Sequence, residues 1–113
     1  MEIKIITREE LVNLQKEKKP KLIDVLDRKS YEKEHLPGAL SIPLDELSGK
    51  AGELLPNKDE LIITYCGGFD CPASTKAAKI LLGQGYKNVL DYKGGLEDYK
   101  AGKLPLESGC HCQ

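Results

Sequence analysis

The sequence has no excess of charge of either sign and no long hydrophobic run. Its 17 basic and 18 acidic residues are mixed along the chain and leave a formal net charge of −1. The absence of a basic stripe argues against a nucleic-acid partner, and the absence of an apolar run of membrane-spanning length argues against a membrane protein. The start of the chain also lacks the apolar stretch of a signal peptide. We therefore expect a cytoplasmic protein.

Cysteine is absent from the first half of the chain, and tryptophan from all of it. The four cysteines form two close pairs in the second half, Cys66 with Cys71 and Cys110 with Cys112. A small secreted domain held together by disulfides would spread its cysteines over the fold. The pattern instead favours reduced thiols that take part in chemistry.

Cys66 stands between an expected strand and an expected helix. An apolar run at residues 61–64 precedes it, and residues 75–82 have the alanine- and leucine-rich composition of a helix. A thiol at this junction would face the N–H groups of a glycine-rich turn and the positive end of the helix dipole. Both favour the thiolate, which is the reactive form of cysteine, so we predict a lowered pKa for Cys66.

Strand-like and helix-like segments alternate along the rest of the chain. With 113 residues, 40% of them hydrophobic, the chain has the size and composition of one globular domain. Expected strands lie near residues 3–6, 22–26, 39–42, 61–65 and 89–91. This alternation predicts an α/β fold with a mainly parallel sheet and helices on both of its faces.

Several helix boundaries can be predicted as well. Thr7 and Glu10 fit a capping box at the start of the first helix, and Ser30 is expected to cap the second. The segment 44–55 is expected to be a broken or short helix because two glycines interrupt it. Ser74 and Thr75 are expected to cap the helix that follows the Cys66 loop, and their hydroxyls could also face the anion held by the loop.

Several separate motifs resemble those of the rhodanese-like domains. The first is Leu22-Ile23-Asp24-Val25, followed by Tyr31 and by the stretch from His35 to Leu44. The others are Cys66 at a strand end, a helix with Ala77-Ala78, the stretch from Gly85 to Val89, and Gly94-Gly95-Leu96. They follow the family's order over nearly the whole chain. We accordingly expect a rhodanese-like domain over residues 1–105 and a flexible C-terminal tail over residues 106–113.

The resemblance implies a three-layer rhodanese-like fold, with a five-stranded, mainly parallel sheet flanked by helices on both faces. It also implies a sulfurtransferase whose catalytic Cys66 takes a sulfane sulfur from a small donor as a persulfide. The sulfur would pass to a thiol, cyanide or a protein acceptor, without a metal or an organic cofactor. The backbone N–H groups of the loop would hold the anionic sulfur, which makes its residues the substrate-binding candidates: Gly67, Gly68, Phe69, Asp70 and Cys71.

The loop departs from the family because it has no arginine. Typical rhodanese loops have arginine directly after the cysteine and near the far end, whereas this loop has Gly67 and an acid, Asp70. Guanidinium groups are the natural partners of a dianion such as thiosulfate. We therefore expect polysulfide or a persulfide to be a better donor than thiosulfate. Phosphatases of this fold need arginine at the place of Pro72, which argues against phosphate or arsenate chemistry.

Cys71 leaves several roles open. Five residues from Cys66 across a curved loop, it could attack a persulfide on Cys66 as a resolving thiol, or protect Cys66 from over-oxidation. It could equally be a small buried hydrophobic residue. Two rival functions follow. One is a thiol redox switch that uses Cys66 and Cys71, and the other is a regulatory or binding domain that keeps the fold without catalysis.

Other candidates have a structural role that competes with a functional one. For Asp24, at a strand end, and Tyr65 we expect structural roles, and for His35 a turn-stabilising role rather than catalysis. Gly94-Gly95 is expected to allow a close backbone approach beside the loop. Cys110-His111-Cys112 could bind a soft metal or carry sulfur, but three ligands so close together do not complete a tetrahedral site. We expect an incidental tail there.

Overall fold

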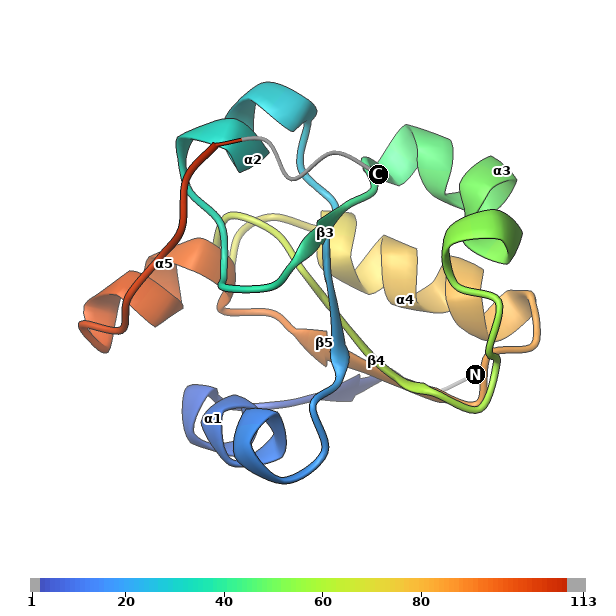
Figure 1. Ribbon diagram of the computed structural model, residues 1–113, viewed down its shortest axis with the longest axis horizontal. Helices are drawn as coiled ribbons and strands as arrows, with labels where there is room; N and C mark the ends of the chain where they lie inside the picture. Colours follow the sequence, from blue (N-terminus) through green and yellow to red (C-terminus); the bar gives the residue numbers. More distant parts are fainter. Residues whose placement is uncertain (1–2, 110–113) are drawn as a thin grey trace.

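A computed structural model describes residues 3–109 as a five-stranded parallel sheet with helices on both faces (Figure 1). The strands are β1 (Lys4–Ile5), β2 (Lys21–Asp24), β3 (Leu40–Ser41), β4 (Leu61–Tyr65) and β5 (Asn88–Tyr92). Their order in the sheet is β1-β5-β4-β2-β3, and every pairing is parallel. All the strands therefore end at the same edge of the sheet, as in the expected α/β fold.

The helices complete the three layers that the sequence predicted. They are α1 (Arg8–Glu17), α2 (Arg28–Lys33), α3 (Leu44–Leu54), α4 (Ala73–Gly83) and α5 (Gly95–Ala101). Helices α3 and α4 cover one face of the sheet, and α1, α2 and α5 cover the other (Figure 1). The central strand β4 is buried along its last four residues because helices lie on both sides of it. Within residues 3–109, no helix has the length and apolar character needed to span a bilayer.

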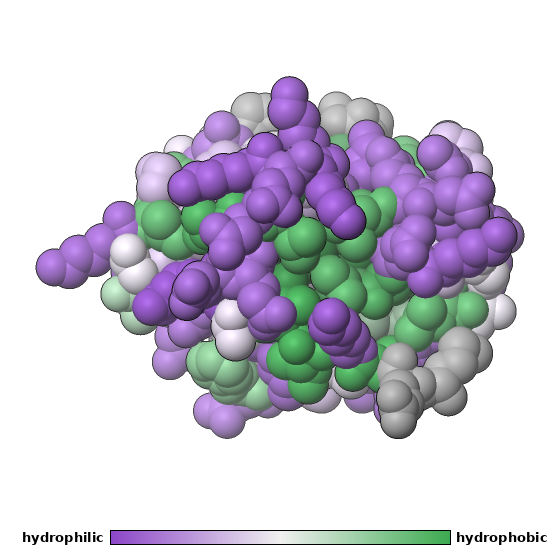
Figure 2. Space-filling view, turned by 90° about the horizontal axis from the view of Figure 1, so that it is seen from below, coloured by the Kyte–Doolittle hydropathy of each residue, from purple (hydrophilic) through white to green (hydrophobic). Residues whose placement is uncertain are grey.

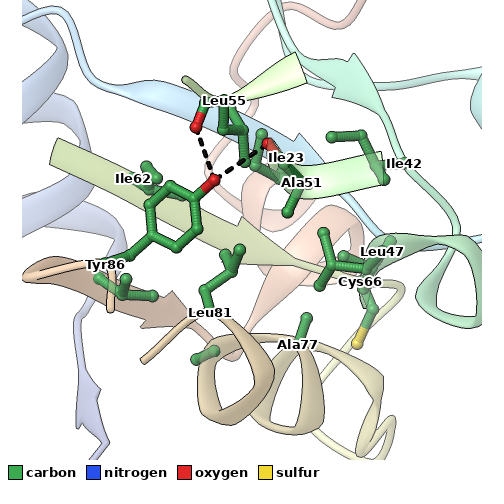
Figure 3. Packing of buried hydrophobic residues seen from close by; sticks show 13 residues of the cluster. Ile23, Ile42, Leu47, Ala51, Leu55, Ile62, Cys66, Ala77, Leu81 and Tyr86 are labelled. Atoms are coloured by element: carbon green, nitrogen blue, oxygen red, sulfur yellow. Dashed lines mark hydrogen bonds between the residues drawn. The ribbon is translucent and has the colours of Figure 1, made fainter. Parts of the chain in front are cut away.

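Each face of the sheet has its own core. The core under α3 and α4, which we call the aliphatic core, is drawn in Figure 3 and includes Ile23, Ile42, Leu47, Ala51, Leu55, Ile62, Ala77 and Leu81, with Cys66 and Tyr86. Its single tyrosine, Tyr86, donates its hydroxyl to the Ala51 carbonyl at 2.9 Å. The core under α1, α2 and α5 has four tyrosines, Tyr31, Tyr65, Tyr92 and Tyr99, and we call it the tyrosine core.

Helix α3 is continuous, so the expected break in it is wrong. Gly49 and Gly52 are exposed, and an added side chain at either position would meet nothing within 4 Å. Leu47 and Ala51, one helical turn apart, are fully buried against the aliphatic core. Burial of this face outweighs the roughly 1 kcal/mol that each glycine costs a helix.

The expected caps of the first two helices have different outcomes. Thr7 and Glu10 form the predicted capping box, because the Thr7 hydroxyl accepts the Glu10 N–H at 3.1 Å and the Glu10 carboxylate accepts the Thr7 N–H at 2.9 Å. The prediction that Ser30 caps α2 is wrong. The helix begins earlier, and its cap is Asp27, whose carboxylate accepts the Ser30 N–H at 2.8 Å.

The segment after residue 105 is joined to the domain as far as the structure describes it. The N–H groups of His35 and Glu107 each donate to the other residue's carbonyl at 2.9 Å. The Gly109 N–H donates to the Glu32 carbonyl at 2.8 Å. Residues 107–109 therefore pair with the fold, although the sequence placed them in a flexible tail. Cys110-His111-Cys112 lies outside the described residues.

Candidate active site

Cys66 directly follows the last residue of β4, at the edge where the parallel strands end. Its side chain points to the same face of the sheet as Ile62, because side chains alternate along a strand. The residue is fully buried at one end of the aliphatic core, beside Leu47 and Ala77 (Figure 3). The central strand thus places a thiol between the sheet and the first turns of α3 and α4.

The loop that carries the predicted substrate-binding residues runs from Cys66 to α4. It is closed by a hydrogen bond from the Cys71 N–H to the Gly68 carbonyl at 3.0 Å. Phe69 and Asp70 are exposed at its tip, and Phe69 has 61% of its surface accessible. The loop therefore presents an apolar ring and a carboxylate to solvent while its two cysteines lie further in.

The start of α5 supports the loop from the opposite side. The Leu96 N–H donates to the Cys66 carbonyl at 3.0 Å, and the Glu97 N–H donates to the Gly67 carbonyl at 2.9 Å. Gly95 has a φ of +57°, and a Cβ atom there would collide with the Cys66 carbonyl. The close backbone approach predicted for Gly94-Gly95 is confirmed at Gly95.

The Cys66 sulfur contacts Cys71 and Ser74. The Cys66 thiol donates to the Cys71 carbonyl oxygen at 3.3 Å, and the Cys71 side chain is near enough to raise the pKa of Cys66. The N–H and the hydroxyl of Ser74 face the Cys66 sulfur from the first turn of α4. Ser74 is fully buried, and within residues 3–109 its hydroxyl makes no hydrogen bond. Both cysteines are free thiols.

The surroundings of the two sulfurs favour negative charge on Cys71 rather than on Cys66. Burial, followed by the hydrogen bond to Cys71, raises the pKa of the Cys66 thiol. Burial alone would also raise the pKa of Cys71, but hydrogen bonds from Cys66 and from the N–H groups of Ala73 and Gly67 lower it, with help from the charge of Lys93. The predicted lowering of the Cys66 pKa is therefore wrong, because burial of the thiol outweighs the lowering by the Ser74 N–H and hydroxyl.

Lys93 is a cation of the site that the sequence did not reveal. Its ammonium group donates to the Cys71 carbonyl oxygen at 3.2 Å. The parallel register pairs Tyr65 of β4 with Tyr92 of β5, so the residues that follow them, Cys66 and Lys93, leave the sheet side by side. The loop itself has no cation, as predicted, but the neighbouring strand supplies one. Only knowledge of this strand pairing could have identified Lys93.

The first turn of α4 is tied to the sheet by hydroxyl groups. The helix begins after Pro72 without a side-chain cap, so the capping role predicted for Ser74 and Thr75 is wrong. The Thr75 hydroxyl instead donates to the Asp91 carboxylate at 2.6 Å. The Thr64 hydroxyl donates to the Ser74 carbonyl at 2.9 Å. These bonds hold Ser74 against the end of β4, which is what brings it to Cys66.

Asp24, His35 and Tyr65 have the structural contacts that were expected of them. The Tyr65 hydroxyl donates to the Asp24 carboxylate at 2.9 Å and accepts the Leu36 N–H at 3.0 Å. Burial raises the pKa of Asp24 to about 6, against the hydrogen bonds from a backbone N–H and from Tyr65. His35 is buried, stacks on Tyr31, and its Nδ1 donates to the Tyr31 carbonyl at 2.6 Å.

A large hollow of the surface lies beside α1 rather than at the thiols. Its volume is about 690 Å³, and its apolar lining includes Ile5, Ile6, Val12, Phe69 and Leu104. Neither Cys66 nor Cys71 lines this hollow. The loop borders it through Phe69. The side of the molecule that carries α1 has an apolar patch framed by hydrophilic side chains (Figure 2).

Known proteins resemble the chain over most of its length. The thiosulfate sulfurtransferase GlpE of Coxiella burnetii is 35% identical over 104 residues, which cover 89% of this chain and 91% of that protein. The thiosulfate sulfurtransferase PspE of Escherichia coli is 34% identical over 82 residues, 73% of this chain and 76% of that protein.

Other relatives are longer than this chain. An HTH-type transcriptional regulator of Mycobacterium tuberculosis is 32% identical over 104 residues, and the chain spans 45% of its length. The solution structure of a rhodanese-like domain from Anabaena superposes with a TM-score of 0.83 at 29% identity, over 96% of this chain and 80% of that one. Residues 7–102 match the rhodanese-like domain as a family. The chain belongs to the rhodanese-like domain family.

Proposed function

We propose that the protein is a sulfurtransferase or persulfide carrier in which Cys66 holds the sulfur that is transferred. The observation that carries this proposal is the pair of free thiols, Cys66 and Cys71, at the end of the central strand of a rhodanese-like fold. Two relatives that are similar over most of the chain are named thiosulfate sulfurtransferases, which supports sulfur transfer as the reaction class.

The proposed reaction has two displacement steps and needs no cofactor. A thiolate of the site attacks the outer sulfur of the donor, the bond between the donor's two sulfurs breaks, and the rest of the donor leaves as an anion. A nucleophilic acceptor, such as a thiol, cyanide or a protein thiol, then attacks the outer sulfur of the Cys66 persulfide and releases the Cys66 thiolate. The Ser74 N–H and hydroxyl stabilise the anionic sulfur on Cys66 in both states.

The donor is proposed to be a polysulfide or a persulfide rather than thiosulfate. Thiosulfate is a dianion, which is best held by the paired N–H groups of a guanidinium. The loop has no arginine, and the ammonium group of Lys93 is engaged by the Cys71 carbonyl. The exposed Asp70 adds a negative charge at the tip of the loop. The ratio of steady-state rates with the two donors tests this preference, and a higher rate with thiosulfate would overturn it.

Removal of the Cys66 sulfur tests the proposed function itself. With polysulfide as donor and a small thiol or cyanide as acceptor, Cys66→Ser is expected to lower the transfer rate by about a hundredfold or more, because serine cannot form the persulfide. Thermal unfolding of the variant shows whether it is folded. Exchange of the exposed Ser108 for alanine is the control and should keep the full rate. A folded Cys66→Ser variant with the wild-type rate would contradict the proposal.

A thiol redox switch is the second candidate function. It is favoured by the contact between the Cys66 and Cys71 sulfurs, since a disulfide needs this proximity. Mild oxidation should then remove two of the four thiols of the wild type and fewer in Cys71→Ala. Four thiols before and after oxidation would exclude the switch. If neither transfer nor oxidation is observed, the remaining candidate is a regulatory or binding domain without catalysis.

The cytoplasm is the proposed location. Reducing conditions keep Cys66 and Cys71 available as free thiols, which both sulfur transfer and a reversible switch require.

A further inference from the structure

The two cysteines of the site differ in their access to solvent. Cys66 has 0% of its surface exposed, whereas Cys71 is partly exposed at the end of the loop. Helix α4 and the aliphatic core cover Cys66 on one face of the sheet, and α5 holds its backbone from the other side. A sulfur donor that arrives from solvent therefore reaches the Cys71 sulfur before it reaches the Cys66 sulfur.

The hydrogen bonds of the two sulfurs also differ. Cys66 donates to the Cys71 carbonyl at 3.3 Å, a bond that only a protonated thiol can make. The Lys93 ammonium lies 3.2 Å from the Cys71 carbonyl oxygen, and its charge lowers the pKa of Cys71 together with the N–H groups of Gly67 and Ala73. These donors and this cation stabilise a thiolate, so the resting nucleophile of the pair is Cys71.

We propose that Cys71 is the first sulfur acceptor, with Lys93 as its positioning cation, and that Cys66 receives the sulfur from Cys71. This inference rests on the proposed sulfurtransferase function and adds the order in which sulfur moves through the site. It assigns a catalytic role to Cys71, for which the sequence left a resolving thiol and a buried hydrophobic residue as alternatives.

The first step loads Cys71. The Cys71 thiolate attacks the outer sulfur of a donor persulfide R–S–SH. A sulfur–sulfur bond forms on Cys71, the bond between the donor's two sulfurs breaks, and R–S⁻ leaves with the electron pair. Cys71 now carries a persulfide, whose terminal sulfur keeps the proton that it had in the donor. No external oxidant or reductant is consumed, because the sulfane sulfur only exchanges its partner.

The second step moves the same sulfur inward. The Cys66 sulfur attacks the outer sulfur of the Cys71 persulfide as the Cys66 proton passes to the departing Cys71 sulfur. The new persulfide is on Cys66, and Cys71 is a thiol again. Atoms, protons and electrons balance without a co-reactant. The acceptor then attacks the outer sulfur of the Cys66 persulfide and releases the Cys66 thiolate.

The surroundings of Cys66 suit a persulfide that is stored. The Ser74 hydroxyl is buried and makes no hydrogen bond within residues 3–109, so it is available for the terminal sulfur together with the Ser74 N–H. The aliphatic core on the far side keeps small thiols away from the inner sulfur. A persulfide at Cys66 is thus stabilised, and its inner sulfur is shielded by the core.

The relay is tested by locating the sulfur during a single turnover. Replacing Cys110 and Cys112 by serine leaves the two site cysteines as the only thiols of the chain. This protein is mixed with polysulfide, quenched with acid at increasing times, and alkylated. Fragmentation of the peptide that contains both cysteines then locates the extra sulfur. It is expected on Cys71 first and on Cys66 later.

Three variants in the same background separate the steps. Cys66→Ser is expected to load Cys71 at the initial rate of the parent and to retain the sulfur there. Cys71→Ser is expected to load Cys66 about tenfold more slowly or worse, because the donor must reach a buried thiol. Lys93→Gln is expected to slow the loading of Cys71 by roughly threefold. Lys79→Gln, an exposed lysine of α4, is the matched control and should change neither step.

The outcomes distinguish the relay from the proposed function. If Cys71→Ser loads Cys66 as fast as the parent, the relay is wrong and direct loading of Cys66 stands. If Cys66→Ser takes up no sulfur while the parent does, the relay is also wrong. If no protein takes up sulfur from polysulfide, persulfide or thiosulfate, the proposed function itself has failed.

Discussion

The two cores of the molecule contribute to the site in different ways. The aliphatic core has one tyrosine and ends in the Cys66 thiol. The tyrosine core instead uses several hydroxyl groups to fix the chain, since Tyr31 donates to the Ala39 carbonyl and Tyr92 donates to the Asp98 carboxylate, both at 2.6 Å. One face thus buries the reactive atom, and the other fixes the backbone that carries it.

This difference shows how a thiol can be buried and still be positioned. The apolar packing around Cys66 offers few directional contacts, so packing alone would leave the strand end free to shift. On the opposite face, Tyr65, the residue next to Cys66, is bonded to Asp24 and to the Leu36 N–H. The hydrogen bonds of Tyr65 thereby fix the position of the neighbouring Cys66 side chain, which itself makes few directional contacts.

Gly95 lies where the two faces meet, and its substitution is expected to have the largest effect. In Gly95→Ala the new methyl group collides with the Cys66 carbonyl at a position whose φ is +57°. We expect a loss of about 4 kcal/mol or more in the free energy of unfolding, with loss of transfer activity. Urea unfolding measures it. Gly52→Ala, at an exposed position of α3, is the control and should be neutral or stabilising. Equal stability of the two variants would show that α5 does not hold the loop.

Leu47→Ala is expected to have the next largest effect, through the aliphatic core. Leu47 is fully buried beside Cys66, and truncation leaves a cavity that a continuous helix cannot close. The expected loss in the free energy of unfolding is about 3 to 4 kcal/mol. The half-buried Leu54 of the same helix provides the comparison, and Leu54→Ala should cost clearly less. Equal losses would mean that the core is not packed as described.

The pH dependence of stability is expected to come in part from Asp24 in the tyrosine core. Its folded-state pKa, about 6, lies above the 3.8 of an exposed aspartate. The folded state therefore holds the Asp24 proton more tightly, so this stabilisation is complete below about pH 4 and is lost as the pH rises to about 6. The difference between wild type and Asp24→Asn in the free energy of unfolding should change by on the order of 3 kcal/mol over that range. A constant difference from pH 4 to pH 7 would rule out the raised pKa.

Tyr65→Phe is expected to have the smallest effect of the four changes. The variant leaves the Asp24 carboxylate and the Leu36 N–H without the hydroxyl that now joins them. We expect a loss of about 2 kcal/mol in the free energy of unfolding. Transfer activity should fall as well, because the strand end next to Cys66 loses its anchor. If the variant is measurably less stable but fully active, the tyrosine core does not position the Cys66 site.

The sequence was sufficient for the fold because several local signals agreed. Alternating strand and helix patterns, the capping box at Thr7 and the apolar run before Cys66 each depend on residues close together in the chain. The break expected at Gly49 and Gly52 failed because tertiary burial outweighed a local propensity. The cap expected at Ser30 failed because an aspartate three residues earlier offered a stronger one.

The site was less predictable because its important contacts join distant segments. Cys66 could be identified from its position after a strand, but its pKa depends first on how deeply the fold buries the thiol. Lys93 comes to the site through the register of β4 and β5, and Ser74 through hydroxyl bonds under α4. Neither the register nor these bonds can be predicted from residues that are close together in the sequence.

The most direct test of the central claim follows one labelled sulfur atom from Cys66 to an acceptor. Wild-type protein is loaded with isotope-labelled polysulfide and freed of excess donor, and the label is located before and after a thiol acceptor is added. We predict that the label is on Cys66 before addition and that its loss from Cys66 matches, in rate and amount, its appearance in the acceptor. A label that stays on Cys66 while the acceptor gains sulfur, or one that never resides on Cys66, would contradict the account.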